Sequence, residues 1–147
     1  MPRRVLFAIA ALAVLAGMCV VTLLAIQIIP FGRTHTNPPV VSEPNWPDPA
    51  VRDLAVRACF DCHSNETKWP WYADVAPMSW VVELDVVRGR RAMNFSDWES
   101  KPRSAEQMVR LIQEGEMPPL TYRLTHPGAQ LTPTEKAQLE QGLAGLH

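Results

Sequence analysis

Two cysteines and a histidine stand close together in the middle of the chain, where Cys59, Cys62 and His63 form the pattern C-x-x-C-H. Thiols separated by two residues lie about one helical turn apart, so both can add to the two vinyl groups on one side of a haem. The histidine that follows at once then lies beneath the iron, where it can act as an axial ligand. The pattern therefore predicts haem c, a single haem bound through two thioethers, with His63 as the proximal ligand.

Pairs of the form Cys-x-x-Cys have two other uses, in zinc sites and in dithiol redox proteins. Zinc would need two more ligands at compatible spacing, and the third cysteine, Cys19, lies in an apolar run near the N-terminus. A redox pair of the thioredoxin type would begin a helix within a βαβ pattern, whereas this pair follows a helical pattern in a strand-poor chain. Both alternatives fit the sequence less well than haem does.

The iron of such proteins commonly takes a methionine on its second face. Met78 and Met108 lie on or beside apolar helical stripes, where packing in the core is expected, and Met93 lies in a less constrained connection. Met117 differs because it precedes two prolines, whose fixed φ angles would hold its thioether in place. We therefore predict Met117 as the second ligand. His126, or a coordination position left open, is the alternative, and filling a gap under a loop is the structural role that Met117 could have instead.

An aromatic cluster follows the cysteine motif within one short stretch, formed by Trp69, Trp71, Tyr72 and Trp80. Rings of this size are expected to wall the core. Indole N–H and phenol O–H groups also need partners when they are buried, and haem propionates would supply them. Trp69, Trp71 and Tyr72 are thus predicted to contribute to haem binding.

Fourteen prolines against seven glycines predict short helices joined by stiff, extended connections, with few strands. Cap residues, first-turn prolines and apolar positions three and four apart mark four helices after the N-terminal run. The predicted helices run from Asp48 into the cysteines, from Pro77 until the charged residues 88–91 end or fray it, from Ser104 to Gly115, and from Thr132 to Leu146.

The N-terminal run from Val5 to Ile29 has no charged residue and is long enough to cross the hydrocarbon layer of a membrane as a helix. Arg3 and Arg4 precede it and would stay in the cytoplasm, which places the rest of the chain on the outer side. A signal peptide that is cleaved is the main alternative, and a lipoprotein signal at Cys19 is another. The length of the run favours an anchor that is retained.

Four segments follow from these observations: a cytoplasmic N-terminus (1–4), a transmembrane anchor (5–29), a proline-rich tether (30–48) and a helical domain (49–147). About 100 exported residues bury only a modest fraction of their surface, so a large apolar prosthetic group would help to fill the core. The predicted fold is all-α, a small helical haem domain behind one N-terminal transmembrane helix.

The sequence resembles the bacterial haem-binding-domain proteins, which are small membrane-anchored c-type monohaem proteins. The resemblance covers roughly residues 45–146 and includes several separate motifs. These are C-F-D-C-H-S-N-E-T at 59–67, W-P-W-Y at 69–72, V-A-P at 75–77, S-W at 79–80, G-R at 89–90, N-F-S at 94–96 with Trp98, G-E-M-P-P at 115–119, Tyr122, and H-P at 126–127.

The resemblance implies a cytochrome c-like haem domain attached through Cys59 and Cys62 and ligated by His63, and its Met-Pro-Pro motif is consistent with Met117 as second ligand. It supplies no redox partner.

Electron transfer is the predicted function, because a haem with both axial positions filled by protein needs little reorganisation and does not readily bind substrate. We expect no catalytic residues and no small-molecule substrate. The near balance of 14 basic and 15 acidic residues gives no basic field for nucleic acid. The alternative is a haem-based sensor or peroxidase-like enzyme with an open distal site. The expected location is the inner membrane, with the haem domain on the periplasmic side.

Overall fold

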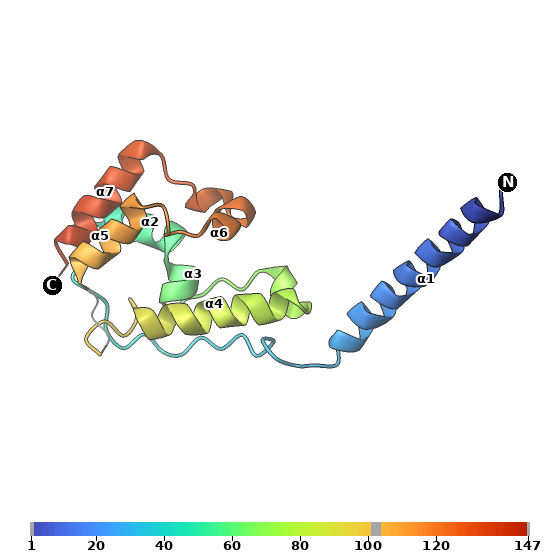
Figure 1. Ribbon diagram of the computed structural model, residues 1–147. Coiled ribbons are helices and arrows are strands. Elements are labelled where there is room, and N and C mark those ends of the chain that lie inside the picture. Colours follow the sequence, from blue (N-terminus) through green and yellow to red (C-terminus); the bar gives the residue numbers. More distant parts are fainter. Residues whose placement is uncertain (1, 101–103, 147) are drawn as a thin grey trace. The chain divides into compact units, whose positions relative to one another are not determined.

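A computed structural model describes residues 2–100 and 104–146 of the chain. The described part is helical, with no strand and one isolated bridge between Ser42 and Asp97, so the all-α prediction is confirmed. The elements in chain order are α1 (Arg3–Ile26), α2 (Pro49–Ala58), α3 (Phe60–His63), the 3-10 helix η1 (Trp71–Asp74), α4 (Met78–Ala92), α5 (Ala105–Gln113), α6 (Leu120–Thr125), η2 (Pro127–Ala129) and α7 (Pro133–Ala144) (Figure 1).

The chain divides into two compact units. The first comprises Met1–His35 and Pro70–Glu83, and the second comprises Thr36–Trp69 and Leu84–His147. Helix α4 contributes residues to both. Residues 70–83, which the sequence assigns to the helical domain (49–147), group here with the N-terminal part of the chain; the four segments stay a prediction.

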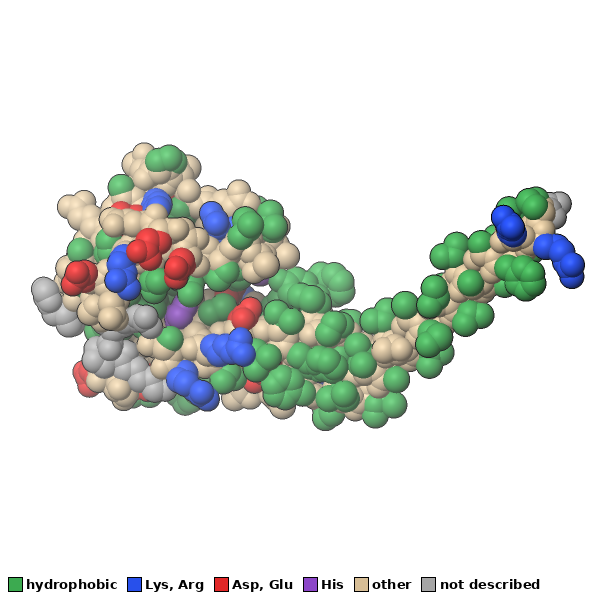
Figure 2. All heavy atoms as spheres, viewed as in Figure 1, with side chains coloured by type: hydrophobic (Ala, Val, Ile, Leu, Met, Phe, Trp, Pro, Cys, Tyr) green, Lys and Arg blue, Asp and Glu red, His purple; other side chains and the backbone are tan. Residues whose placement is uncertain are grey.

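In the first unit, α1 is long and apolar enough to cross a membrane, and none of its residues is buried. Hydrophobic side chains cover its visible face in Figure 2. The helix ends beside the turn that precedes α4. There the Gln27 side chain donates to the Ala76 carbonyl oxygen (2.8 Å) and accepts from the Ala76 backbone N–H (3.0 Å). This pair of hydrogen bonds attaches residues 70–83 to the end of α1.

In the second unit, α2 begins where its sequence predicts. Asp48 accepts a hydrogen bond from the Ala50 backbone N–H (2.8 Å), and Pro49 occupies the first turn, where its missing N–H costs nothing. The apolar stripe of the helix, which includes Val51 and Leu54, is buried. That burial is the main stabilisation of so short a helix.

Helices α5 and α7 pack against each other and, with α2, enclose the core of this unit (Figure 1). Ser104 caps α5, and Gly115 ends it at a φ of +76°, a conformation that glycine adopts without strain. At the start of α7, Thr132 and Glu135 form a reciprocal capping box. Both helix starts predicted from the sequence are confirmed.

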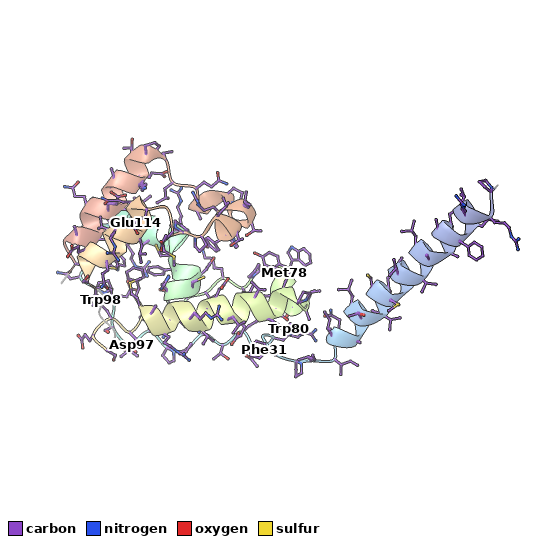
Figure 3. The ribbon with its side chains drawn as sticks, viewed as in Figure 1. Phe31, Met78, Trp80, Asp97, Trp98 and Glu114 are labelled. Carbon is purple, nitrogen blue, oxygen red and sulfur yellow. The ribbon has the colours of Figure 1, made fainter. Side chains whose placement is uncertain are left out.

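Stacked aromatic rings join this core to the proline-rich segment. Phe95 stacks on Phe60 (5.3 Å between ring centroids) and on Trp98 (5.7 Å; labelled in Figure 3), and Trp46 packs on Phe95 (5.2 Å). The segment is extended, as its prolines predict. Its part from Thr36 onward is nevertheless fixed along the second unit, for example by the hydrogen bond from the Val41 backbone N–H to the Ser96 carbonyl oxygen (2.8 Å).

The ion pair between Arg57 on α2 and Glu135 on α7 makes stability depend on pH. Hydrogen bonds from Arg57 and Thr132 lower the pKa of Glu135 from 4.5 to about 2. The folded protein therefore releases this proton more readily than the unfolded chain. The stabilisation is complete above the unfolded pKa and is lost as pH falls through the folded value.

We expect the melting temperature, followed by circular dichroism in detergent, to fall more steeply between about pH 5 and about pH 3 in the wild type than in Glu135→Gln. Gln can still serve in the capping box, so the helix start is preserved. Arg57→Gln, which leaves the hydrogen bonds from Thr132 to Glu135, should give a slope between those of the wild type and Glu135→Gln. Equal slopes in all three proteins would show that the pair does not stabilise the fold.

Candidate functional site

The cysteine motif lies at a break between two helices. Helix α2 ends at Ala58, Cys59 leaves the helical region (φ −129°, ψ −36°), and α3 then adds a single turn that carries Cys62 and His63. The motif lies at the end of the preceding helix, as predicted. The prediction did not include the break at Cys59 or the separate turn α3. The backbone N–H of His63 still donates to the Cys59 carbonyl oxygen (2.9 Å), so the motif occupies one turn.

Helix α4 passes directly against this turn at Gly89. A Cβ atom at this position would lie 2.2 Å from the carbonyl oxygen of Cys62 and 2.8 Å from its carbonyl carbon, both of them backbone atoms. The expectation that residues 88–91 end or fray the helix is wrong, because α4 continues to Ala92. Packing against α3 keeps this glycine within the helix despite its low helix propensity.

The same contact orients His63, the predicted proximal ligand. His63 Nδ1 lies 3.0 Å from the Gly89 carbonyl oxygen and 3.3 Å from that of Met93. A carbonyl oxygen only accepts, so Nδ1 carries the hydrogen and Nε2 carries the lone pair that binds a metal. A backbone carbonyl that fixes the tautomer in this way is a usual partner of a ligating histidine.

The two motif thiols are held neutral. Burial raises the pKa of Cys59 to about 12, with a smaller effect of Cys62, and burial together with Asp85 and Asp61 raises the pKa of Cys62 to about 12. Thiols of dithiol redox proteins are activated by the opposite shift, so the dithiol alternative is disfavoured. Within residues 2–100 and 104–146, no three His, Cys, Asp or Glu side chains are placed to hold a metal ion.

Two cavities lie in the second unit beside Cys59, and they share Cys59, Ile112 and Met117 in their linings. The lining of the smaller cavity therefore includes Cys59, His63 and Met117, whereas Cys62 is not among the lining residues given for either cavity, and the predicted roles of these residues stay predictions. The smaller cavity, about 120 Å³, is lined by Ala58, Cys59, His63, Ala92, Met93, Phe95, Met108, Leu111, Ile112, Met117 and Leu143. The larger, about 410 Å³, is lined by Cys59, Ile112, Gly115, Met117, Pro118, Leu120, Arg123, Leu124, Ala129, Gln130, Leu131, Lys136 and Leu139.

The end of α5 positions Met117. After the turn at Gly115, the backbone N–H of Met117 donates to the Leu111 carbonyl oxygen (3.1 Å), and Pro118 follows in the lining of the larger cavity. The Met117 side chain is 37% exposed, so it lies at the edge of the cavities rather than deep in the core. Met93 and Met108 also line the smaller cavity but are buried.

His126 lies elsewhere. Its ring stacks on Tyr122 (4.0 Å between centroids, 15° between planes), and its Nδ1 is 3.1 Å from the Tyr122 carbonyl oxygen. Neither cavity has His126 in its lining as described. Of the two residues considered as second ligand, only Met117 borders the cavity that also contains His63.

The aromatic residues predicted to bind haem are distributed over both units. Trp69 is half-buried in the second unit and is not among the lining residues given for either cavity. Trp71 and Tyr72 form part of η1 in the first unit, where their rings meet edge to face at 5.8 Å and Trp71 is 79% exposed. Their predicted part in haem binding stays a prediction.

Two residues to which the sequence assigned no role hold the motif in place. Asp61, inside the motif, accepts hydrogen bonds from the Tyr122 hydroxyl (2.7 Å) and the Lys68 backbone N–H (3.0 Å). Burial, followed by this contact with Asp61, raises the pKa of Tyr122. Arg90 donates to the Ser64 carbonyl oxygen (2.7 Å) just after the motif. Both residues lie in motifs that the resemblance covers, but a pattern cannot show that Asp61 meets Tyr122 or that Arg90 meets Ser64, because these partners are distant along the chain.

A family model described as "Haem-binding domain" matches residues 21–144, most of the chain. The chain belongs to the haem-binding domain family. Searches of curated proteins and of solved structures gave no match. The cavities fit a haem, because they offer a mainly apolar lining, an imidazole with Nε2 in the metal-binding form and a thioether.

Replacing Gly89 by alanine should disturb the site of this haem-binding protein. The added Cβ meets the backbone of Cys62, so α3 and α4 must separate. Overpacking of this kind costs about 1–3 kcal/mol of stability. The movement should also lengthen the hydrogen bond from His63 to Gly89. We expect a lower unfolding midpoint in denaturant and an altered Soret band.

Gly128→Ala is the matched control, since a Cβ at Gly128 meets nothing within 4 Å. It should leave both the midpoint and the spectrum close to those of the wild type. A Gly89→Ala protein indistinguishable from this control would show that the close contact is not what positions His63.

Proposed function

We propose that this haem-binding protein is a c-type cytochrome that transfers single electrons. Cys59 and Cys62 form the two thioethers, and His63 and Met117 are the axial ligands. The observation that carries the proposal is that Cys59, His63 and Met117 line one apolar cavity of the second unit. When bound there, the haem supplies a one-electron iron couple.

The residues around the cavity favour electron transfer over catalysis as the function. A methionine ligand fills the second axial position and raises the reduction potential. The polar groups that an open distal site would use are engaged elsewhere: the Tyr122 hydroxyl donates to Asp61, and His126 stacks on Tyr122. No catalytic residue is assigned, and the sensor or peroxidase-like alternative has less support.

The first unit supports a membrane anchor. Helix α1 is apolar and exposed along its length, and Arg3 and Arg4 at its start favour a cytoplasmic N-terminus. The segments joined to its other end expose further apolar side chains, including Phe31 (48%), Trp71 (79%) and Met78 (42%); Phe31 and Met78 are labelled in Figure 3. Exposed aromatic rings at the end of a spanning helix suit the interface between lipid and water. We place the haem domain on the periplasmic side of the inner membrane.

Replacing Met117 by alanine tests the axial ligand. Wild-type protein produced with a c-type maturation system should show a low-spin spectrum with the weak near-infrared band of an iron–methionine bond. The variant should lose this band, bind carbon monoxide when reduced and have a lower reduction potential, because the thioether stabilises the reduced iron.

Met78→Ala is the control, because Met78 belongs to the first unit and its side chain is 42% exposed. It should keep the band and the potential. If the wild type is high-spin and binds carbon monoxide readily without denaturant, the electron-transfer proposal fails and the sensor alternative gains support.

Protease treatment of intact spheroplasts tests the orientation. We expect added protease to remove the haem domain without lysis, because the chain after α1 lies outside the cytoplasm. A cytoplasmic protein should stay intact in the same sample. Protection of the haem domain until the membrane is broken would contradict the proposed orientation.

A further inference from the structure

The larger cavity beside Cys59 carries two positive charges. Arg123, on α6, and Lys136, on α7, both line it, while the rest of its lining is largely apolar. The lining residues identified in the described part of the chain include no aspartate or glutamate. A ligand that fits this cavity therefore has an apolar body and an anionic edge.

Arg123 is positioned for such a ligand. Its Nε atom is buried and has no hydrogen-bond partner among residues 2–100 and 104–146. The hydrogen bond from Gln130 reaches the Arg123 carbonyl oxygen and leaves the guanidinium unaffected. A buried donor without a partner costs free energy unless a ligand supplies the acceptor.

Lys136 is also able to contribute. Its Nζ atom lies 3.8 Å from an oxygen of Glu140, one turn further along α7, and its side chain is 38% exposed. The Glu140 side chain is 18% exposed, and at 3.8 Å the pair lies near the outer limit for an ion pair, so it contributes little to stability. The ammonium group can therefore interact with a second carboxylate without losing a strong interaction.

We propose that Arg123 and Lys136 bind the haem propionates, with Arg123 as the principal contact. The inference rests on the proposed position of the haem in the two cavities that share Cys59 and Met117. A haem has the required apolar body, and its two propionates are carboxylates, which a guanidinium binds through paired hydrogen bonds. This assigns to two cations the role that the sequence suggested for Trp69, Trp71 and Tyr72.

Resonance Raman spectra of the haem protein test the assignment, because the propionate bending band responds to hydrogen bonds at the carboxylates. Arg123→Gln should shift this band and lower the midpoint potential, since losing a positive charge near the iron favours the ferric state. Arg123→Lys keeps the charge and should retain most of the potential while still shifting the band. Lys136→Gln should give a smaller change in the same direction.

Arg110→Gln is the matched control, because Arg110 on α5 is 65% exposed and is not in the lining of either cavity. It should leave the band and the potential unchanged. If Arg123→Gln does not accumulate, Arg123→Lys and Lys136→Gln decide the question. If every Arg123 and Lys136 variant binds haem and shows the wild-type Raman band and midpoint potential, the inference is wrong.

These outcomes are distinct from a failure of the proposed function. If Met117 is not an axial ligand, the near-infrared spectrum of the wild type will lack the iron–methionine band. That result would not change how the propionate Raman band responds to substitution of Arg123. Conversely, an unchanged Raman band would remove Arg123 and leave the covalent haem and its axial ligands in place.

Discussion

The close contact between α3 and α4 at Gly89 is the constraint on which the site depends. The contact leaves no room for a side chain at this position, since a Cβ would lie 2.2 Å from the Cys62 carbonyl oxygen. It also brings the Gly89 carbonyl oxygen within 3.0 Å of His63 Nδ1. One backbone approach thus sets the distance between two helices and the tautomer of His63, the proposed ligand, and leaves the lone pair of Nε2 able to bind a metal.

Hydrogen bonds from other residues of the second unit support this contact between α3 and α4. Arg90, the residue after Gly89, donates to the Ser64 carbonyl oxygen (2.7 Å) and to the Thr36 carbonyl oxygen (2.9 Å), which links the motif to the extended segment. Asp61 links the motif to α6 through the Tyr122 hydroxyl. Helix α6 in turn carries Arg123 to the larger cavity. The hydrogen bond between Asp61 and Tyr122 therefore connects the motif with the helix that carries Arg123, the principal residue proposed to bind the propionates.

Sequence patterns that span only a few residues predicted several helix starts and the position of the cysteine motif. The caps at Asp48, Ser104 and Thr132 and the cysteine motif follow from interactions within a few residues, so the sequence showed them directly. Features set by distant contacts could not be predicted in this way. That α4 continues past Gly89 depends on its contact with α3. Helix α6 has no side-chain cap and no buried residue that would mark it in the sequence. Trp71 lies close to the motif in the sequence but belongs to the first unit.

The most direct test of the central claim is the mass of the intact, denatured chain after expression with a c-type maturation system. The account predicts the mass of the chain plus one haem, with the haem found on the peptide that contains Cys59 and Cys62 and still present after extraction with acidified acetone. The same mass would show whether α1 is retained. A chain that loses its haem on denaturation, or that carries the haem on another peptide, would contradict covalent attachment at the C-x-x-C-H motif.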